Sequence, residues 1–409
     1  MLSEIDVENL IQPFADRQKA IETFIINLIA KCVRQIGTML PSDIYKLERL
    51  LKTGSDVREI NKALARLTGL QESQIKQVIK EVAADSYKDA KPYYDYRHKS
   101  FVPLMQNEPL AKAIEAIGRQ TIATYKNLSN TRMIGFLIRD MKNPNKLRFY
   151  NVSQAYKSII DEAIQAVQSG VTDYNSAMRR TLKQLNNSGL KRMYWDSGYA
   201  QRLDSAVKRN VLDGVRQVNQ EVHKITGEQF GADGYEITAH NLPAPDHAPF
   251  QGHMLAKAQY EKLQSSQDFV DVNGKHFHGV ERVLCQWNCK HFAYPVILGV
   301  SKPKYTDKQL QQILDNNEQG ATIGGKHYTG YELTQKQNEI ALKVRQMKDG
   351  QVMAVNAGDM ELAKQYQAKV NQWSKRYNAF NEKVSQQMPN WSPRKDKLTV
   401  SGYKRISAA

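Results

Sequence analysis

The chain has 409 residues, of which 41% are hydrophobic and 24% are charged. These values are close to those of globular proteins and exclude a wholly disordered, collagen-like or low-complexity chain. The charge balance is unusual, because 58 Lys and Arg against 42 Asp and Glu give a net charge of +16 at pH 7. Such an excess favours a polyanionic neighbour, either nucleic acid or an anionic membrane surface.

The most apolar stretch, from Thr23 to Val33, is too short to span a membrane. Asn27 and Lys31 interrupt it well before the roughly 20 apolar residues that a spanning helix needs. The N-terminus is acidic and shows no secretory signal, and three cysteines are too few for a disulfide framework. We therefore expect a reducing compartment, no membrane partner, and nucleic acid as the polyanion.

The excess positive charge is concentrated in two segments of the chain. Residues 101–230 carry 19 basic and 11 acidic side chains, and residues 301–409 carry 18 and 10, so each has a net charge of +8. Residues 231–300 carry 5 basic and 7 acidic side chains. Because the histidines and cysteines gather in this slightly acidic segment, we expect polyanion contact and the unusual chemistry in different places.

The first 95 residues show helical periodicity. Apolar residues recur at steps of three and four from Ile21 to Ile36, which is typical of one buried helix face. After Pro41 come three short helical patterns, and Gly54 and Gly69 stand where the C-caps of two of them would fall. We therefore predict a cluster of short helices as the first domain, over residues 1–95.

A second, mainly helical domain is predicted over residues 96–230, beyond a turn-rich junction at 93–98. Its clearest pattern is a long helix from Leu203 to Val222. Three arginines at seven-residue steps would share the other face of this helix. They are Arg202, Arg209 and Arg216. This face is either an ordinary solvated helix face or a contact stripe for DNA or a protein partner.

A small α+β module is predicted over residues 231–300. Alternation from Tyr235 to Ala239 predicts a strand. The pair Asn273-Gly274 between two alternating runs predicts a type I′ hairpin, because both turn residues need a positive φ. A third apolar run, from Tyr294 to Val300, predicts the last strand, and its Pro295 favours an edge position.

The last domain, residues 301–409, returns to helical periodicity. Two apolar stripes, from Leu333 to Met347 and from Tyr366 to Val384, are joined by a loop around Ala357-Gly358-Asp359. They predict an antiparallel helical hairpin, followed by a basic, extended tail from Pro393. The predicted fold class is thus mainly α, with a small inserted α+β module and a C-terminal helical hairpin.

Six of the nine histidines and two of the three cysteines lie between residues 240 and 291. Imidazole and thiolate are ligands that zinc favours, and two pairs from separate loops could close a tetrahedral structural site. The spacings His-x6-His and Cys-x-His are not established zinc signatures, however. Two alternatives stay open: a metal-free cluster of hydrogen-bonded side chains, and a catalytic site.

Several motifs occur in a characteristic order along the chain. They are Tyr194-Trp195-Asp196-Ser197-Gly198-Tyr199, Arg202-Leu203-Asp204, Ala239-His240, Ala244-Pro245-Asp246-His247, Gln251-Gly252 and Asn288-Cys289-Lys290-His291. Together they resemble the phage minor capsid protein family of the phage minor capsid protein 2 type, which is related to the Mu F-like head morphogenesis proteins. The resemblance covers roughly residues 1–400, and it makes residues 96–230 a Mu F-like core.

The resemblance implies a minor virion protein of a tailed phage, attached to the portal inside the head and close to packaged DNA. Its expected partners are the portal protein, phage double-stranded DNA and the major capsid or scaffold protein, and it would occupy the host cytoplasm during assembly. The arginine stripe would then face DNA or the portal. The implied site positions are His240, His247, Cys289 and His291, with structural zinc as the metal interpretation and no other cofactor.

An enzyme is the alternative from a different functional class. A metal-dependent hydrolase delivered with the virion could act on nucleic acid or on the cell wall. Such chemistry usually needs a carboxylate as general base, and Asp246 is the only acidic residue among the His and Cys motifs. The sequence therefore favours a non-enzymatic assembly protein with no catalytic residue.

Overall fold

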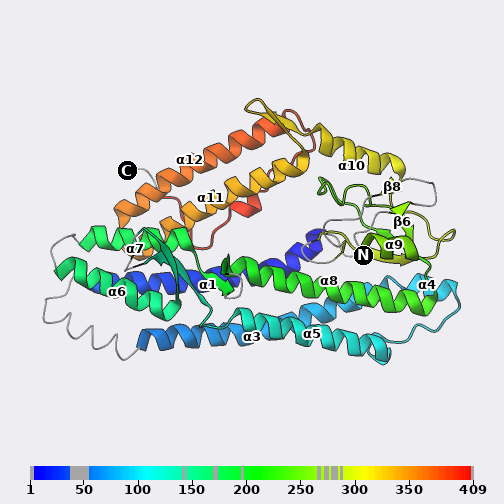
Figure 1. Cartoon of the computed structure of the whole chain (residues 1–409), viewed down its shortest axis with the longest axis horizontal. Helices are drawn as coiled ribbons and strands as arrows, with labels where there is room; N and C mark the ends of the chain where they lie inside the picture. The colour runs from blue at the N-terminus through cyan, green and yellow to red at the C-terminus, as the bar shows by residue number, and fades with distance from the viewer. Residues whose placement is uncertain are drawn as a thin grey trace.

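Long helices make up most of the protein, as the sequence predicts (Figure 1). The computed structural model describes residues 4–36, 55–140, 143, 145–168, 174–194, 198–264, 269–270, 276–277, 284–285 and 289–406. The α-helices are α1 (Glu4–Ile36), α3 (Ser55–Lys88), α4 (Lys91–Tyr96), α5 (Glu108–Leu128), α6 (Val152–Gln168), α7 (Tyr174–Ser188), α8 (Leu203–Phe230), α9 (Lys257–Gln264), α10 (Asp307–Gln319), α11 (Gly330–Asn356) and α12 (Met360–Ser385). Two 3-10 helices are η1 (Leu104–Gln106) and η2 (Lys395–Leu398).

The strands form small antiparallel sheets. One sheet has the order β2-β1-β3-β4, with β1 (Ile134–Arg139), β2 (Leu147–Asn151), β3 (Lys191–Tyr194) and β4 (Tyr199–Arg202). A second has the order β6-β5-β9, with β5 (Gly234–Ile237), β6 (Met254–Ala256) and β9 (Ala293–Val296). Two-stranded pairs are β7 (Phe269–Val270) with β8 (His276–Phe277), and β10 (Ala321–Ile323) with β11 (Lys326–Tyr328).

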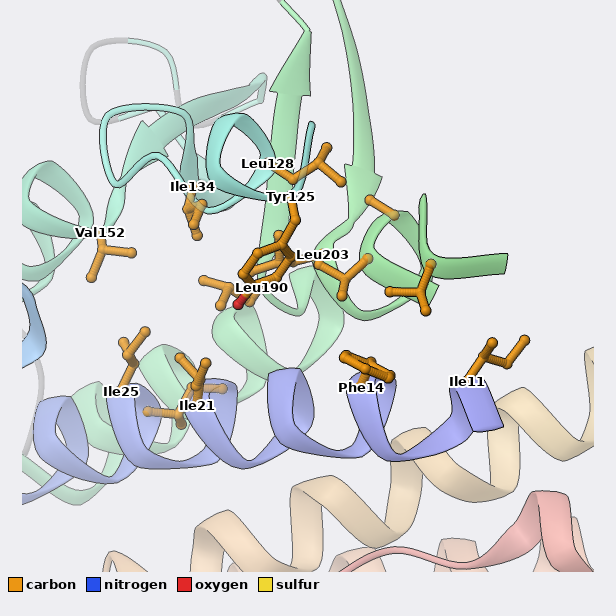
Figure 2. Close-up of a cluster of buried hydrophobic side chains, with 14 of the residues drawn as sticks. Ile11, Phe14, Ile21, Ile25, Tyr125, Leu128, Ile134, Val152, Leu190 and Leu203 are labelled. Carbon is orange, nitrogen blue, oxygen red and sulfur yellow. The ribbon is translucent and has the colours of Figure 1, made fainter. Parts of the chain in front are cut away.

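The largest core forms where α8 packs against α1, α3 and α5. Figure 2 shows one face of α1 pointing into it. The α1 side chains are Ile11, Phe14, Ile21 and Ile25, and those that they face include Tyr125, Ile134, Leu190 and Leu203. The predicted α1 stripe is confirmed at Ile21 and Ile25, which are buried. All four predicted domains contribute side chains to this core, from Val7 to Tyr366, so packing is continuous across the predicted boundaries.

The prediction of short separate helices in the first 95 residues is wrong for the described residues from 55 onward. The helix α3 runs without interruption from Ser55 to Lys88, and Gly69 lies in its middle rather than at a C-cap. A C-cap glycine takes a left-handed backbone, whereas Gly69 is not among the residues with a positive φ. The helix expected after Pro41 lies outside the described residues. The expected turn at 93–98 is largely the short helix α4.

The sheet within residues 96–230 is a second correction, because the mainly helical domain predicted there included no named strand. Its central strand β1 reads Ile-Gly-Phe-Leu-Ile-Arg and is buried at four of six positions. A strand buried on both faces does not alternate between apolar and polar residues, so the sequence gives no period of two. Gly135 allows close pairing with β2, since a Cβ there would come within 2.6 Å of the Cα of Asn151.

The strands predicted in the α+β module are confirmed. The strand β5 pairs with β9, which lies at one edge of its sheet with Pro295 opposite Tyr235. The strands β7 and β8 pair in an antiparallel register, and the turn at Asn273-Gly274 between them lies outside the described residues.

The C-terminal helical hairpin is confirmed, and α11 and α12 run antiparallel above the main layer (Figure 1). Asp359 caps α12 by accepting a hydrogen bond from the backbone N–H of Leu362 at 2.9 Å. The sequence did not predict α10 or the β10–β11 pair that precede the hairpin. The tail packs back on α11, because Gln351 Nε2 donates to the carbonyl of Lys404 at 2.6 Å. None of the described helices combines the length and apolar character needed to cross a bilayer.

Candidate functional site

Three predicted site residues meet inside the α+β module. His247 lies in the turn between β5 and β6, while Cys289 and His291 immediately precede β9. The two segments are joined by the backbone of Thr238, whose N–H donates to the carbonyl of Phe292 at 2.8 Å. His247 and Cys289 are each 3% exposed and His291 is 1% exposed. The cluster is therefore sealed from solvent.

The thiol of Cys289 is the centre of the cluster. Its Sγ lies 3.5 Å from Nδ1 of His247 and 3.4 Å from Nδ1 of His291. The backbone N–H of His291 also donates to this sulfur at 3.4 Å. Ligand atoms from all three side chains lie within 4.8 Å of one another, the only such grouping of three or more His, Cys, Asp or Glu among the described residues.

Both histidines have a polar neighbour at the far ring nitrogen. Nε2 of His247 lies 3.5 Å from Oδ2 of Asp246. Nε2 of His291 lies 3.4 Å from Oε1 of Gln251, which also accepts the backbone N–H of His240 at 3.1 Å. With this amide oxygen as the acceptor, Nε2 of His291 is the donor. Each ring therefore turns Nδ1 toward the sulfur.

The electrostatics of the cluster lower the pKa of the Cys289 thiol. Burial is the largest single influence and raises the pKa of the Cys289 thiol, but the hydrogen bond and charge of His247, together with the backbone N–H groups of His291 and Cys285, hold this pKa below its usual value. Burial, helped by the charges of His240 and His247, lowers the pKa of His291 to about 2. A neutral imidazole and a thiolate are the forms in which these side chains bind a soft or borderline cation.

The fourth predicted ligand, His240, lies beside this group rather than within it. Its ring lies against the His291 ring with centroids 4.5 Å apart, and its Nδ1 is 3.0 Å from the carbonyl of Asn241. Cys285 is buried nearby, and burial together with Cys289 raises the pKa of its thiol. His253 is exposed. His278 lies outside the described residues.

The predicted arginine stripe is wrong as a shared exposed face. Arg202 precedes α8 and pairs with Glu22 at 2.8 Å and with Asp204 at 3.2 Å. Arg216 is only 4% exposed, and Arg209 alone is exposed. The physical reason is that α8 is the central helix, covered by α1, α3, α5 and β9, so little of its polar side reaches solvent.

A basic groove that the sequence did not reveal lies where α7 meets β1 and β3. It has a volume of about 620 Å³, and its apolar lining residues include Leu137 and Ile138. Its cationic side chains are Arg139, Arg180, Lys183 and Lys191, and none of the described residues that line it is acidic. Arg139 comes from β1, about 40 residues before the cations of α7 and β3, and the only signal in the sequence was the +8 charge of residues 101–230.

Comparison with known proteins identifies the family. The family model described as Phage minor capsid protein 2 matches residues 3–382, nearly the whole chain. No curated protein and no solved structure matches the chain significantly. The chain therefore belongs to the phage minor capsid protein 2 family, and it is a structural component of a phage virion.

Proposed function

We propose that the protein is a non-enzymatic minor capsid protein that attaches to the portal inside the phage head and contacts packaged double-stranded DNA. It would reach this position from the host cytoplasm during assembly, together with the portal and the major capsid or scaffold protein. The portal partner rests on the family resemblance. The DNA partner rests in addition on the basic groove, which is the observation that carries the proposal.

The groove suits a phosphate backbone by its charge. Four cationic side chains line it and none of its described lining residues is acidic, so neighbouring phosphates could each approach a cation. Arg180 has one acidic neighbour, Glu162, at 3.9 Å, but both side chains are about half exposed. Such an exposed pair is weak and readily exchanged for a phosphate. Burial, with a contribution from Arg202, lowers the pKa of Lys191, so a bound anion would stabilise its charged form.

Contact through phosphates implies binding without sequence preference. Base readout needs side chains that enter a DNA groove from a projecting element, or aromatic platforms for unstacked bases. The described lining contains no aromatic side chain, and its cations sit in a recess between α7 and the sheet. A protein that holds many different stretches of packaged DNA has no need of base specificity.

The sealed His and Cys cluster supports a non-enzymatic role. A hydrolase must bring its substrate and a water molecule to the metal or nucleophile. The three cluster side chains are at most 3% exposed, so a nucleic acid or cell-wall polymer has no path to them in this conformation. The hydrolase alternative would require this module to open.

Charge reversal in the groove tests the DNA contact. The variant Arg180→Glu/Lys183→Glu removes two exposed cations of α7. The matched control Lys76→Glu/Lys80→Glu makes the same charge change at two exposed positions of α3. Fluorescence anisotropy with a double-stranded DNA fragment measures the affinity at about 50 mM salt, where phosphate contacts are strong. We expect the groove variant to bind DNA at least 10-fold more weakly than the parent, and the control variant less than threefold more weakly. Equal losses in both variants would show that only net charge matters.

A further inference from the structure

We propose that His247, Cys289 and His291 bind one zinc ion, which joins the turn after β5 to the segment before β9. These three side chains leave the fourth tetrahedral position to a non-protein ligand, and because all three are buried the site would be structural rather than catalytic. The inference is independent of the portal and DNA proposal, because it concerns the stability of the α+β module alone.

The distances within the cluster fit a tetrahedral zinc ion. A Zn–S bond of about 2.3 Å and a Zn–N bond of about 2.0–2.1 Å at a tetrahedral angle separate sulfur from nitrogen by about 3.6 Å. The Sγ of Cys289 lies 3.5 Å from Nδ1 of His247 and 3.4 Å from Nδ1 of His291. Only small side-chain movements would thus be needed to place an ion between the three atoms.

The outer hydrogen-bond partners point the same way. Metal-bound histidines commonly donate their second ring N–H to a carboxylate or a carbonyl oxygen, which orients the ring. Asp246 is so placed for His247 and the amide oxygen of Gln251 for His291, at 3.5 and 3.4 Å. A ring nitrogen of each histidine and the sulfur of Cys289 lie within 4.8 Å of one another, which is the convergence that a cation bound between them requires.

The surroundings explain why a metal would be structural. The cluster adjoins a small apolar core that includes Ile237, Phe250, Leu255 and Leu284. Small modules with such a limited core often depend on a metal for part of their folding free energy. One sulfur and two imidazoles favour zinc over hard cations such as magnesium, which prefer oxygen ligands.

The direct test is the metal content of the full-length protein. We expect about one zinc per chain by mass spectrometry after expression with zinc and extensive dialysis, and near zero for Cys289→Ser. Two matched controls should keep the zinc: Cys285→Ala, a buried cysteine outside the ligand group, and His253→Ala, an exposed histidine of the same module. X-ray absorption should show one sulfur ligand. A parent protein without zinc, or zinc loss in Cys285→Ala equal to that in Cys289→Ser, would overturn the assignment.

A second variant keeps the test decisive if Cys289→Ser does not fold. Asp246→Asn retains all three ligands and removes only the carboxylate beside His247. We expect its zinc affinity to fall 10- to 100-fold, as for other outer partners of metal-bound histidines, in a competition titration with a chromogenic chelator. In the parent, a strong chelator should lower Tm, and added zinc should restore it. An Asp246→Asn affinity equal to that of the parent, or a Tm insensitive to chelator and zinc, would contradict the proposal.

Discussion

Glu22 is the acidic centre of a buried charge network that links three helices. Its carboxylate lies 2.8 Å from Nη2 of Arg202 and 3.0 Å from Nζ of Lys19. Lys19 also pairs with Asp349 of α11 at 2.7 Å, and Arg202 with Asp204 of α8 at 3.2 Å. Burial of charge is costly unless each ion keeps its partners. The network therefore stabilises the packing of α1 against α8 and α11 only when all of its ions are present.

Neutralising Glu22 should thus be strongly destabilising. We expect Glu22→Gln to lower the free energy of unfolding by about 3 kcal/mol, because two cations would lose their shared partner in a buried site. The control Glu115→Gln removes the same charge from an exposed pair with Arg119 at 3.2 Å, and it should cost less than about 1 kcal/mol. Urea denaturation followed by circular dichroism measures both, and similar costs would mean that the network is well solvated.

A buried histidine should make stability depend on pH. His223 of α8 is 1% exposed, lies 3.3 Å from Nδ2 of Asn219 and packs edge-on against Tyr294. Burial lowers the pKa of His223 to about 3. The unfolded chain takes up a proton near pH 6.5 and the folded chain only near pH 3. The folding stability that depends on a neutral His223 is thus fully present above pH 6.5 and is lost as the pH falls toward 3.

The variant His223→Gln isolates this effect. Between pH 7 and pH 5 the parent should lose about 2 kcal/mol of stability through His223, and the variant should lose that much less. The control His327→Gln, at an exposed position of β11, should follow the parent. Urea denaturation at several pH values measures the three slopes. Parallel slopes for parent and His223→Gln would show that His223 takes up its proton without unfolding.

Elements with long apolar stripes were predictable, whereas short or enclosed ones were not. The α11–α12 hairpin followed from its regular spacing, and Tyr377 and Val384 are buried as that spacing requires. The β2-β1-β3-β4 sheet escaped because its strands are short and β1 is buried on both faces. Gly69 lies inside α3 and does not end it, since a glycine marks a helix end only where the backbone turns left-handed.

The candidate site was likewise predictable only in part. Histidines and cysteines are rare, so their gathering between residues 240 and 291 was visible in the sequence. Which of them converge depends on how two loops meet, and spacing along the chain does not determine that. The cations of the basic groove are common residues on separate elements. Only the packing of α7 against the sheet brings them together.

Two helical glycines provide an opposed pair of predictions. In α11 a Cβ at Gly350 would come within 2.6 Å of Cδ1 of Tyr366 on α12. Gly350→Ala must therefore separate the two helices, and it should lower the free energy of unfolding by about 1–3 kcal/mol. In α3 no atom lies within 4 Å of a Cβ at the exposed Gly69. Gly69→Ala should therefore stabilise the protein by about 1 kcal/mol. Thermal denaturation should show Tm shifts of opposite sign, and a Gly350→Ala protein as stable as the parent would mean that the hairpin packs loosely.

At the scale of the whole molecule, the two notable features lie at opposite ends. The basic groove lies beside α7, and the His and Cys cluster lies in the module that contains β6 and α9 (Figure 1). The α11–α12 hairpin extends from the core, where Arg179 of α7 pairs with Asp359 at 2.6 Å. The end that would meet DNA is thus separate from the end that would hold metal.

The salt dependence of DNA binding should report the number of phosphate contacts. If each of the four groove cations neutralises one phosphate, the logarithm of the binding constant should fall with the logarithm of salt concentration with a slope of about −3 to −4. The variant Arg180→Glu/Lys183→Glu should reduce the steepness by about 2. Anisotropy titrations between about 50 and 200 mM salt measure both slopes. Binding that is insensitive to salt would exclude a phosphate contact.

The most direct test of the central claim is a reconstruction of the intact virion without imposed symmetry. We expect density for the long α1, α3, α5 and α8 layer and the projecting α11–α12 hairpin at the portal vertex, inside the head, with the α7 groove facing the innermost DNA. Virions in which the protein is present only outside the head, or sits away from the portal vertex, would contradict the proposed function.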